Sequence, residues 1–182
     1  MGKTIEKNFW ESRNVFITGH TGFKGSWLSL WLSSLGSNVT GYSHSLPSNP
    51  NLFTEANVEK HVTSVEGDVR DLSKLQLAIE KFQPEIVIHL AAQSLVFNSF
   101  EDPLGSYETN VMGTVNLFEA VRKSPNIRSV IIVTSDKCYD ITPTHRSYVE
   151  SDPLGGDDPY SSSKGCAELV AAAYRRSFLN TP

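Results

Sequence analysis

Three glycines spaced three residues apart constrain the fold of this chain more than any other feature. Gly19, Gly22 and Gly25 directly follow the run 15–18, which is short, apolar and β-branched and therefore predicts a buried strand. The apolar residues after the turn recur at helical spacing and are Trp27, Leu28, Trp31, Leu32 and Leu35. A strand, a glycine turn and a helix in this order can cradle a phosphate, because glycine lets the backbone approach a ligand and the helix N-terminus offers N–H donors. The spacing differs from the standard G-x-G-x-x-G fingerprint, so a plain strand-to-helix turn stays an alternative.

Composition limits the class of protein. The 182 residues are 39% hydrophobic, enough for the core of one large domain. A net charge of −4 without a basic block gives no support to nucleic-acid or anionic-membrane binding. Cys138 and Cys166 lie far apart and the five histidines show no ligand spacing, so neither a disulfide framework nor a metal site is expected. Residues 1–13 lack the apolar core of a signal peptide and no run has membrane-spanning length, so we expect a cytoplasmic protein.

Apolar runs of strand length alternate with helical patterns along the whole chain. Further strands are predicted at 39–42, 61–66, 85–90 and 128–134, and helices at 52–57, 73–82, 104–123 and 159–174. Ser73 is the predicted N-cap of its helix. This alternation predicts an α/β fold, a Rossmann-like doubly wound parallel sheet with strand order 3-2-1-4-5.

Two strand ends bear on a dinucleotide. In a Rossmann unit the end of the second strand carries an acidic residue for the ribose, but here Tyr42, Ser43, His44 and Ser45 stand there, which leaves the cofactor open. Asp68 follows the third strand and could accept a hydrogen bond from an adenine amino group. A turn or cap role for Asp68 is an equal alternative.

The fourth strand ends in two alanines and is followed by a largely apolar helix. Ala91 and Ala92 would let a nicotinamide ribose approach the backbone, although close packing explains them equally well. Asn110 lies within the first turns of the helix, and a polar side chain in that setting is usually a core residue whose hydrogen bonds are satisfied.

Polar side chains gather after the fifth strand and again at the start of the last helix. Ser135, Asp136 and Lys137 follow the strand directly, and charged groups at a buried strand end indicate a cleft in which they are used. Tyr160 and Lys164 stand four residues apart and share a helix face. An ammonium group near a phenol favours the phenolate, which could take the proton of a sugar or alcohol hydroxyl. Taken alone, the pair also fits a surface helix.

Together these motifs resemble the extended short-chain dehydrogenase/reductase family of nucleotide-sugar enzymes, over nearly the whole chain. The matching strings are 18–25, 67–71, 89–92 and the Tyr160-x-x-x-Lys164 pair. The strings 19–28 and 134–139 are similar to the branch of its 4,6-dehydratases that acts on CDP-glucose. The Asp136-Lys137 pair is typical of that branch, whereas other dehydratases of the family have Thr-Asp-Glu in that run.

The resemblance implies an NAD site, a catalytic set and a reaction. Implied cofactor-binding residues are Gly19, His20, Gly22, Phe23, Lys24, Gly25, Asp68, Val69, Leu90, Ala91, Ala92, Tyr160 and Lys164. Implied catalytic residues are Ser135, Asp136, Lys137, Tyr160 and Lys164. The implied reaction oxidises C4 of CDP-glucose, removes water across C5 and C6 and reduces C6, which supplies deoxysugars for bacterial surface polysaccharides. A homodimer is implied as well, with no nucleic-acid or membrane partner.

Members of this family are roughly twice as long as this chain. We therefore expect residues 1–182 to be the NAD-binding Rossmann-like domain, incomplete and without the last strands and the C-terminal nucleotide-sugar domain, and to be inactive alone. Two rivals remain. Another epimerase or reductase of the family would give Asp136 and Lys137 no chemical role, and a non-catalytic dinucleotide-binding or assembly module would bind cofactor without turnover.

Overall fold

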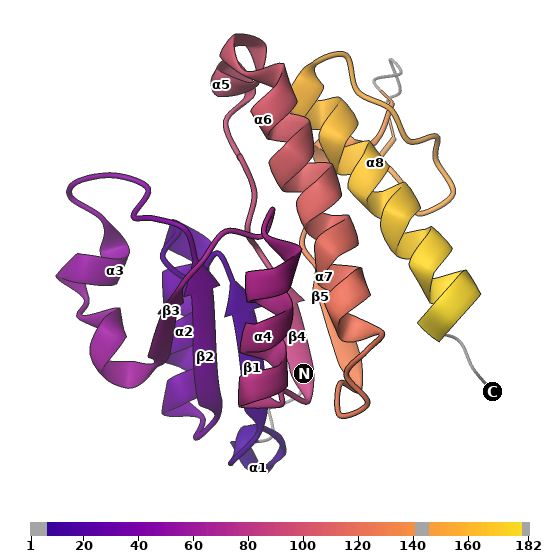
Figure 1. Cartoon of the computed structure of the whole chain (residues 1–182). Coiled ribbons are helices and arrows are strands. Elements are labelled where there is room, and N and C mark those ends of the chain that lie inside the picture. Colours follow the sequence, from indigo (N-terminus) through magenta and orange to yellow (C-terminus); the bar gives the residue numbers. More distant parts are fainter. Residues whose placement is uncertain (1–6, 141–145, 180–182) are drawn as a thin grey trace.

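A five-stranded parallel sheet forms the centre of the molecule in the computed structural model, which describes residues 7–140 and 146–179. Its strands, in the order β3-β2-β1-β4-β5, are β1 (Asn14–Thr18), β2 (Asn38–Ser43), β3 (Thr63–Glu66), β4 (Ile86–His89) and β5 (Ser129–Ile132). The predicted α/β class and strand order are confirmed. Because every strand runs the same way, the strand ends that carry the sequence motifs meet at one edge of the sheet (Figure 1).

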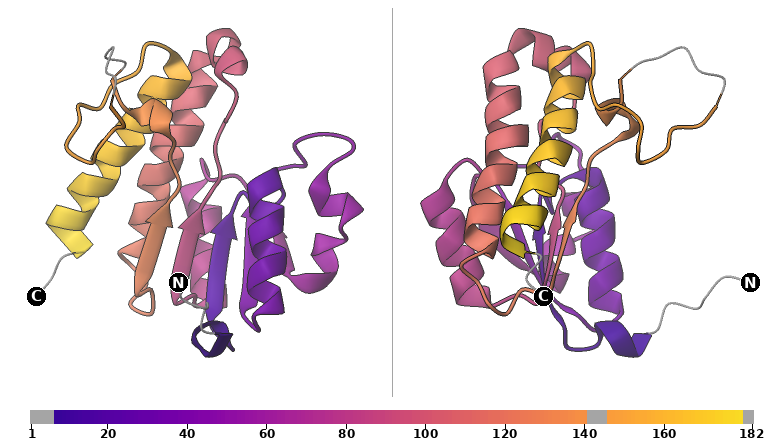
Figure 2. Two further views of the ribbon diagram at one scale, coloured as in Figure 1. Left: turned by 180° about the vertical axis from the view of Figure 1, so that it is seen from behind. Right: turned by 90° about the vertical axis from the view of Figure 1, so that its right-hand side faces the viewer.

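Helices cover both faces of the sheet (Figure 2). One face carries α2 (Phe23–Ser34), which contacts α3 (Leu52–Glu55) and the 3-10 turn η1 (Val58–His61). The helices of the other face are α4 (Leu72–Phe82), α6 (Pro103–Tyr107), α7 (Gly113–Val121) and α8 (Pro159–Tyr174). Short elements complete the described chain and are α1 (Lys7–Trp10), α5 (Val96–Glu101), the 3-10 turn η3 (Asp136–Cys138) and the π turns η2 (Glu108–Met112) and η4 (Arg175–Leu179).

The hydrophobic core lies in two layers, one on each face of the sheet. Phe16 of β1 belongs to the layer under α4 and α7, together with Tyr42, Val87 and Leu117. Its neighbours Val15 and Ile17 belong to the layer under α2 with Leu32. A strand that is buried on both faces needs no polar alternation, which explains the nearly continuous apolar runs of the central strands β1 and β4.

The predicted elements differ from the structure at several boundaries. The predicted strands 61–66 and 128–134 are shorter, as β3 (Thr63–Glu66) and β5 (Ser129–Ile132), and the predicted helix 52–57 ends at Glu55. The N-cap of α4 is Asp71 and not Ser73, because the Asp71 carboxylate accepts a hydrogen bond of 3.0 Å from the backbone N–H of Lys74. The short helix α5 was not predicted. The predicted helix 104–123 begins at Pro103 behind the N-cap Asp102 and contains the π turn η2 around Asn110.

The predicted apolar faces are only partly buried. Leu32 of α2 is 2% exposed, but Trp27 and Trp31 are 57% and 50% exposed, and Leu77 of α4 is 66% exposed. The predicted loop between the fifth strand and the last helix is described apart from 141–145. The expectation about the end of the chain at 180–182 lies outside the described residues.

Candidate active site

The glycine turn lies directly on the end of β4. Gly19 has a left-handed φ of +74°, and a Cβ at this position would lie 2.7 Å from the backbone nitrogen of Ala91. A Cβ on Gly25 would lie 2.1 Å from the carbonyl oxygen of Gly19, so the first turn of α2 is pressed against the loop. Gly22 is the N-cap of α2 and supplies no side-chain cap. A glycine-containing loop at a helix N-terminus without a side-chain cap fits the pyrophosphate of a dinucleotide.

The side chain of His20 faces the protein interior and not the glycine cradle. It is fully buried, with Nδ1 3.1 Å from Ser43 Oγ and Nε2 2.8 Å from Ser64 Oγ. Burial lowers the pKa of His20 to about 4, so the ring is neutral at neutral pH. A Cβ on Gly41 would lie 2.2 Å from this ring. The His20 side chain therefore joins the glycine loop to the ends of β2 and β3, and only its backbone could face a cofactor.

Phe23 and Lys24 open α2 with exposed side chains. Phe23 is 70% exposed beside the glycine cradle. Lys24 is the second residue of α2, directly after the glycine turn, and its positive charge contributes to lowering the pKa of Lys164 on α8. The first turn of α2 thus carries one cation toward the edge where the strands end.

Asp68 lies at the end of β3 in an ion pair with Arg70. Its carboxylate accepts hydrogen bonds from the Arg70 backbone N–H (2.9 Å) and from the Arg70 guanidinium (2.7 Å). The guanidinium holds the pKa of Asp68 below its ordinary value. His44 Nε2 lies 3.9 Å from the same carboxylate. The turn role that the sequence allowed for Asp68 is present, and a half-buried carboxylate remains at the edge where an adenine would lie.

Val69 and the residues after β4 are held by packing. The Val69 side chain is 4% exposed and would meet a Cβ on Gly113 at 2.7 Å. Leu90 packs against the core layer under α2, and Ala91 against the opposite layer. Ala91 and Ala92 are half-buried. Close packing therefore accounts for Ala91.

A buried hydrogen-bond chain runs from β1 to α7 through His89. Burial lowers the pKa of His89 to about 3, so its ring is neutral. The Thr114 hydroxyl donates to Asn110 O (2.7 Å) and lies 3.3 Å from His89 Nε2. The Nε2–H must therefore donate to Thr114, and Nδ1 accepts from the Thr18 hydroxyl at 2.7 Å. Thr18 Oγ1 in turn accepts from the N–H of Ala91 (3.1 Å).

Asn110 continues this chain to the start of α8. Its side chain accepts from the backbone N–H of Gln93 (2.8 Å) and donates to Gln93 O (2.9 Å) and to Ser163 Oγ (2.8 Å). Ser163 donates to the carbonyl oxygen of Tyr160 at 2.6 Å. Asn110 is the satisfied core residue that the sequence predicted. Gln93 and Ser163 were not singled out, because only the amide on the apolar helix gave a signal.

Tyr160 and Lys164 lie on one face of α8, as predicted. The helix begins behind Asp158, whose carboxylate accepts from Ser161 N at 2.9 Å. Lys164 is 7% exposed, and its Nζ lies 5.9 Å from the centre of the Tyr160 ring. Burial lowers the pKa of Lys164 to about 8, with Lys24 acting in the same direction and Glu168 against it. The two side chains thus supply a phenol that could act as a base and an ammonium group beside it.

Ser135, Asp136 and Lys137 form the start of η3, next to α8. Ser135 Oγ accepts a hydrogen bond of 3.0 Å from the backbone N–H of Lys137. A Cβ on Gly165 of α8 would lie 3.2 Å from the carbonyl oxygen of Cys138, so η3 and α8 are in direct backbone contact. Asp136 and Lys137 are exposed. The structure therefore brings the predicted catalytic residues onto two adjacent elements at the same edge of the sheet.

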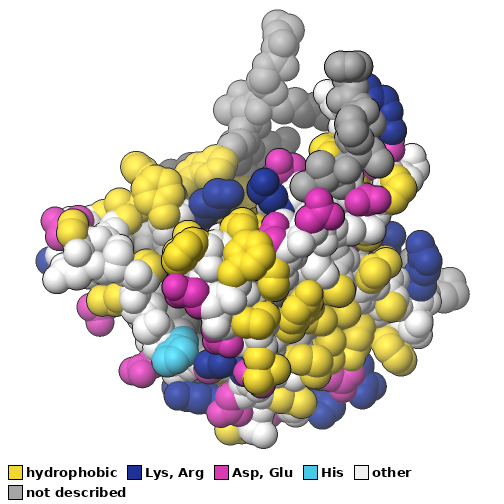
Figure 3. Space-filling model, turned by 90° about the horizontal axis from the view of Figure 1, so that it is seen from above, with side chains coloured by type: hydrophobic (Ala, Val, Ile, Leu, Met, Phe, Trp, Pro, Cys, Tyr) yellow, Lys and Arg dark blue, Asp and Glu magenta, His cyan; other side chains and the backbone are white. Residues whose placement is uncertain are grey.

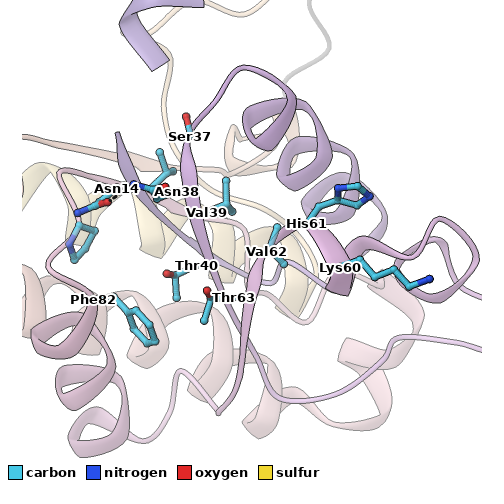
Figure 4. Close-up of a pocket in the computed structure, with 12 residues that line it drawn as sticks. Asn14, Ser37, Asn38, Val39, Thr40, Lys60, His61, Val62, Thr63 and Phe82 are labelled. Atoms are coloured by element: carbon cyan, nitrogen blue, oxygen red, sulfur yellow. Dashed lines mark hydrogen bonds between the residues drawn. The ribbon is translucent and has the colours of Figure 1, made fainter. Parts of the chain in front are cut away.

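A hollow of about 430 Å³ lies at the opposite edge of the sheet (Figure 4). It is lined by residues that begin β1, β2 and β3, among them Asn14, Asn38 and Thr63, and by Lys60 and Phe82. None of the predicted site residues lines it. Because open α/β sheets bind ligands at the carboxyl ends of their strands, this hollow is separate from the candidate active site.

The described residues contain neither a membrane-spanning helix nor a cluster of metal ligands. None of the helices within residues 7–140 and 146–179 combines the length and apolar character needed to cross a bilayer. The same residues contain no group of three or more His, Cys, Asp or Glu side chains that could hold a metal ion.

Comparison with known proteins identifies relatives along almost the whole chain. Residues 16–180 match the family model described as GDP-mannose 4,6 dehydratase. The chain is 54% identical over 176 residues to CDP-glucose 4,6-dehydratase of Salmonella typhimurium, which covers 97% of this chain and 49% of that protein. The chain thus spans about half the length of the curated relatives it matches.

Solved structures of an epimerase and a dehydratase share the fold of this chain. UDP-glucose 4-epimerase from Brucella ovis, in complex with NAD, is 30% identical with a TM-score of 0.79, over 92% of this chain and 49% of that one. The dTDP-glucose 4,6-dehydratase from Streptomyces venezuelae, with NAD bound, is 27% identical with a TM-score of 0.80, over 90% and 52%.

Proposed function

The chain belongs to the GDP-mannose 4,6-dehydratase family, and on that premise we propose that it is the cofactor-binding half of a nucleotide-sugar 4,6-dehydratase that acts on CDP-glucose. The observation that supports this most is the contact between η3, which carries Asp136 and Lys137, and α8, which carries Tyr160 and Lys164. The 54% identity to the Salmonella typhimurium dehydratase supports the same substrate.

NAD is the proposed cofactor. Gly19, Gly22 and Gly25 with the N-terminus of α2 would hold its pyrophosphate. The glycines at 19 and 25 let the loop pack closely on β4 and α2, and the helix N-terminus offers N–H donors to an anion. Asp68 would bind the adenine, and Lys164 would bind the nicotinamide ribose. The residues after β2 offer no carboxylate to the ribose, so the preference over NADP should be modest. When bound, NAD+ supplies a hydride acceptor for C4 of the sugar and a donor for C6.

The side chains of η3 and α8 would move the protons. Tyr160 Oη, on the same helix face as the Lys164 ammonium, would take the proton of the C4 hydroxyl, and Ser135 would hydrogen-bond the same sugar oxygen. A ketone at C4 makes the C5 proton acidic. Asp136 and Lys137 would together serve the elimination: the pair would remove the C5 proton and protonate the leaving C6 hydroxyl, so that water is lost across C5 and C6. The product is CDP-4-dehydro-6-deoxyglucose.

The fold likeness to UDP-glucose 4-epimerases favours a second candidate, an epimerase of the same family. It would use Tyr160 and Lys164 in the same way but would leave Asp136 and Lys137 without a chemical step. A non-catalytic dinucleotide-binding module is the alternative from another class, and it would bind NAD without turnover.

We propose that the protein forms a homodimer through the helices around α6 and α8. Exposed apolar side chains lie on this side and are Phe97, Phe100, Leu104, Met112 and Leu169. Hydrophobic side chains also form a broad area on the face seen from above in Figure 3, the end of the molecule at which α5 lies. Burying such side chains would stabilise a dimer, which sedimentation at micromolar concentration would detect. We place the enzyme in the cytoplasm, with its product destined for surface polysaccharides.

The experiment that tests the activity uses a chimera that joins this chain to the second half of the Salmonella typhimurium relative. Incubated with CDP-glucose and NAD+, the chimera should form a product that has lost water, detected by mass spectrometry. An isomer of unchanged mass would instead establish the epimerase, and NAD binding without any product would support the binding module. Calorimetry should show NADP binding no tighter than NAD. NADP binding more than about tenfold tighter, a difference of about 1.4 kcal/mol, would refute the cofactor assignment.

A further inference from the structure

Glu168 lies on the same face of α8 as the proposed catalytic pair. It follows Lys164 by four residues, one helical turn, and its side chain is half-buried. Its Oε1 accepts a hydrogen bond from the hydroxyl of Thr134. Thr134 immediately precedes Ser135, a proposed catalytic residue. Glu168 therefore holds the neighbour of a catalytic residue and is not itself proposed to be catalytic.

The segment between β5 and η3 is attached to α8 at two successive residues. Lys164 Nζ donates to the carbonyl oxygen of Val133 at 3.5 Å, a long hydrogen bond, and Glu168 accepts from Thr134. Beyond these, Gly165 lies against Cys138 O in η3. Val133 is also fixed to β4, because its N–H donates to His89 O at 3.0 Å, and Cys138 O accepts from the N–H of Gly155 at 2.9 Å. Between these two residues, the hydrogen bond from Thr134 to Glu168 joins the segment to α8.

The charges around Lys164 come from several elements. Lys24 of α2 faces it from one side, neutral His89 of β4 lies close enough for its own pKa to be lowered by the Lys164 charge, and Tyr160 lies one turn before it. Glu168 is the group that opposes the loss of the Lys164 proton. Its carboxylate thus has two effects that can be separated by mutation, a hydrogen bond to Thr134 and a negative charge near Lys164.

We propose that Glu168 is a positioning residue of this site: by holding Thr134 it keeps Ser135 and η3 in register with the face of α8 that presents Tyr160 and Lys164. The role of these residues in sugar oxidation rests on the proposed function. The hydrogen bond between Glu168 and Thr134 and its effect on η3 do not rest on the proposed function, and both can be measured without turnover.

Matched variants of the chain as it stands separate the two effects. Thr134→Val removes the hydroxyl and keeps the Glu168 charge, whereas Glu168→Gln removes the charge and keeps an oxygen that can accept from Thr134. The N–H of Cys138 donates to Ser135 O at 3.0 Å and reports on η3. In Thr134→Val its hydrogen exchange should be about tenfold faster, and in Thr134→Ser it should return to the unmodified rate.

The Glu168→Gln variant tests the charge. Its Cys138 exchange should stay unchanged, while the titration of Lys164, followed by NMR with labelled lysine and assigned with Lys164→Arg, should move to lower pH. Thr134→Val should leave that titration in place. Melting temperatures of all variants check that each is folded.

The outcome is decided independently of the proposed function. Unchanged Cys138 exchange in folded Thr134→Val would overturn the positioning role of Glu168. An unchanged Lys164 titration in Glu168→Gln would overturn its second effect, that of its charge on Lys164. In the chimera, Thr134→Val should lower kcat for sugar oxidation about tenfold with little change in KM. If the unmodified chimera showed no turnover, the dehydratase proposal would fail while the exchange and titration results still stood.

Discussion

The ammonium nitrogen of Lys164 lies 5.9 Å from the centre of the Tyr160 ring, on the same face of α8. Tyr160→Phe removes the phenol and leaves this geometry in place. Sugar oxidation in the chimera should then slow by about 10²-fold or more, the usual scale for a lost acid–base group. Nicotinamide absorbance after mixing with CDP-glucose measures it, and NAD affinity is the control. Oxidation at the unmodified rate would remove Tyr160 from the catalytic set.

Lys137→Met tests the residue pair that separates a dehydratase from an epimerase. The substitution keeps the side-chain length and removes the charge from an exposed position of η3. The first oxidation should survive, while water loss should slow by about 10²-fold, so a 4-keto-glucose intermediate should accumulate on the enzyme. Rapid quenching with mass detection measures both steps. Water loss at the unmodified rate would contradict the assignment of the elimination step to Lys137.

Gly19→Ala and Gly22→Ala form a matched pair in the glycine turn. At Gly19 the φ of +74° and the contact of 2.7 Å with Ala91 should make the substitution cost about 1–3 kcal/mol of unfolding free energy, and NAD binding should be lost. Gly22 has a φ of −68°, and its Cβ would lie 3.3 Å from Gly19 O, so its variant should be closer to native stability. Thermal unfolding and calorimetry compare them. Equal stability would show that the loop adapts.

Two buried neutral histidines should make the stability depend on pH. The folded-state pKa values of His20 and His89 are lowered to about 4 and about 3, below the unfolded value of 6.5. As the pH falls below 6.5 the unfolded chain takes up protons that the folded chain does not. The free energy of unfolding should therefore decrease between pH 6.5 and about 4, by up to about 1.4 kcal/mol per pH unit for each ring.

Urea unfolding at several pH values measures this loss of stability. His20→Asn should reduce the slope, whereas replacing the exposed His61 should leave it unchanged. A flat profile in the unmodified chain would mean that the two rings take up protons in the folded state.

Local sequence patterns predicted the strands and the Tyr160–Lys164 face, because each depends on residues close together in the chain. The strand order depends on distant pairs, such as Val15 with Ile86, and was predicted from the Rossmann pattern of alternating strands and helices. The contacts of His20 and Glu168 could not be predicted in this way. His20 meets Ser43 and Ser64, 23 and 44 residues later, and Glu168 meets Thr134, 34 residues earlier. Helical spacing also predicted an apolar face on α2 but could not say that Trp27 and Trp31 face solvent. The sequence offered both Ser73 and Asp71 near the start of α4, and the structure shows that the Asp71 carboxylate caps it by accepting from Lys74 N–H.

Strand β5 pairs with β4 on one side only, and within the described residues no strand lies on its other side. The backbone N–H and C=O groups on its outer side could therefore pair with an extended strand of another chain. Ile131 of β5 is 47% exposed. Pairing of β5 between two copies of the chain would promote self-association. Association of this chain through β5 should therefore increase with concentration, which light scattering over a dilution series would detect.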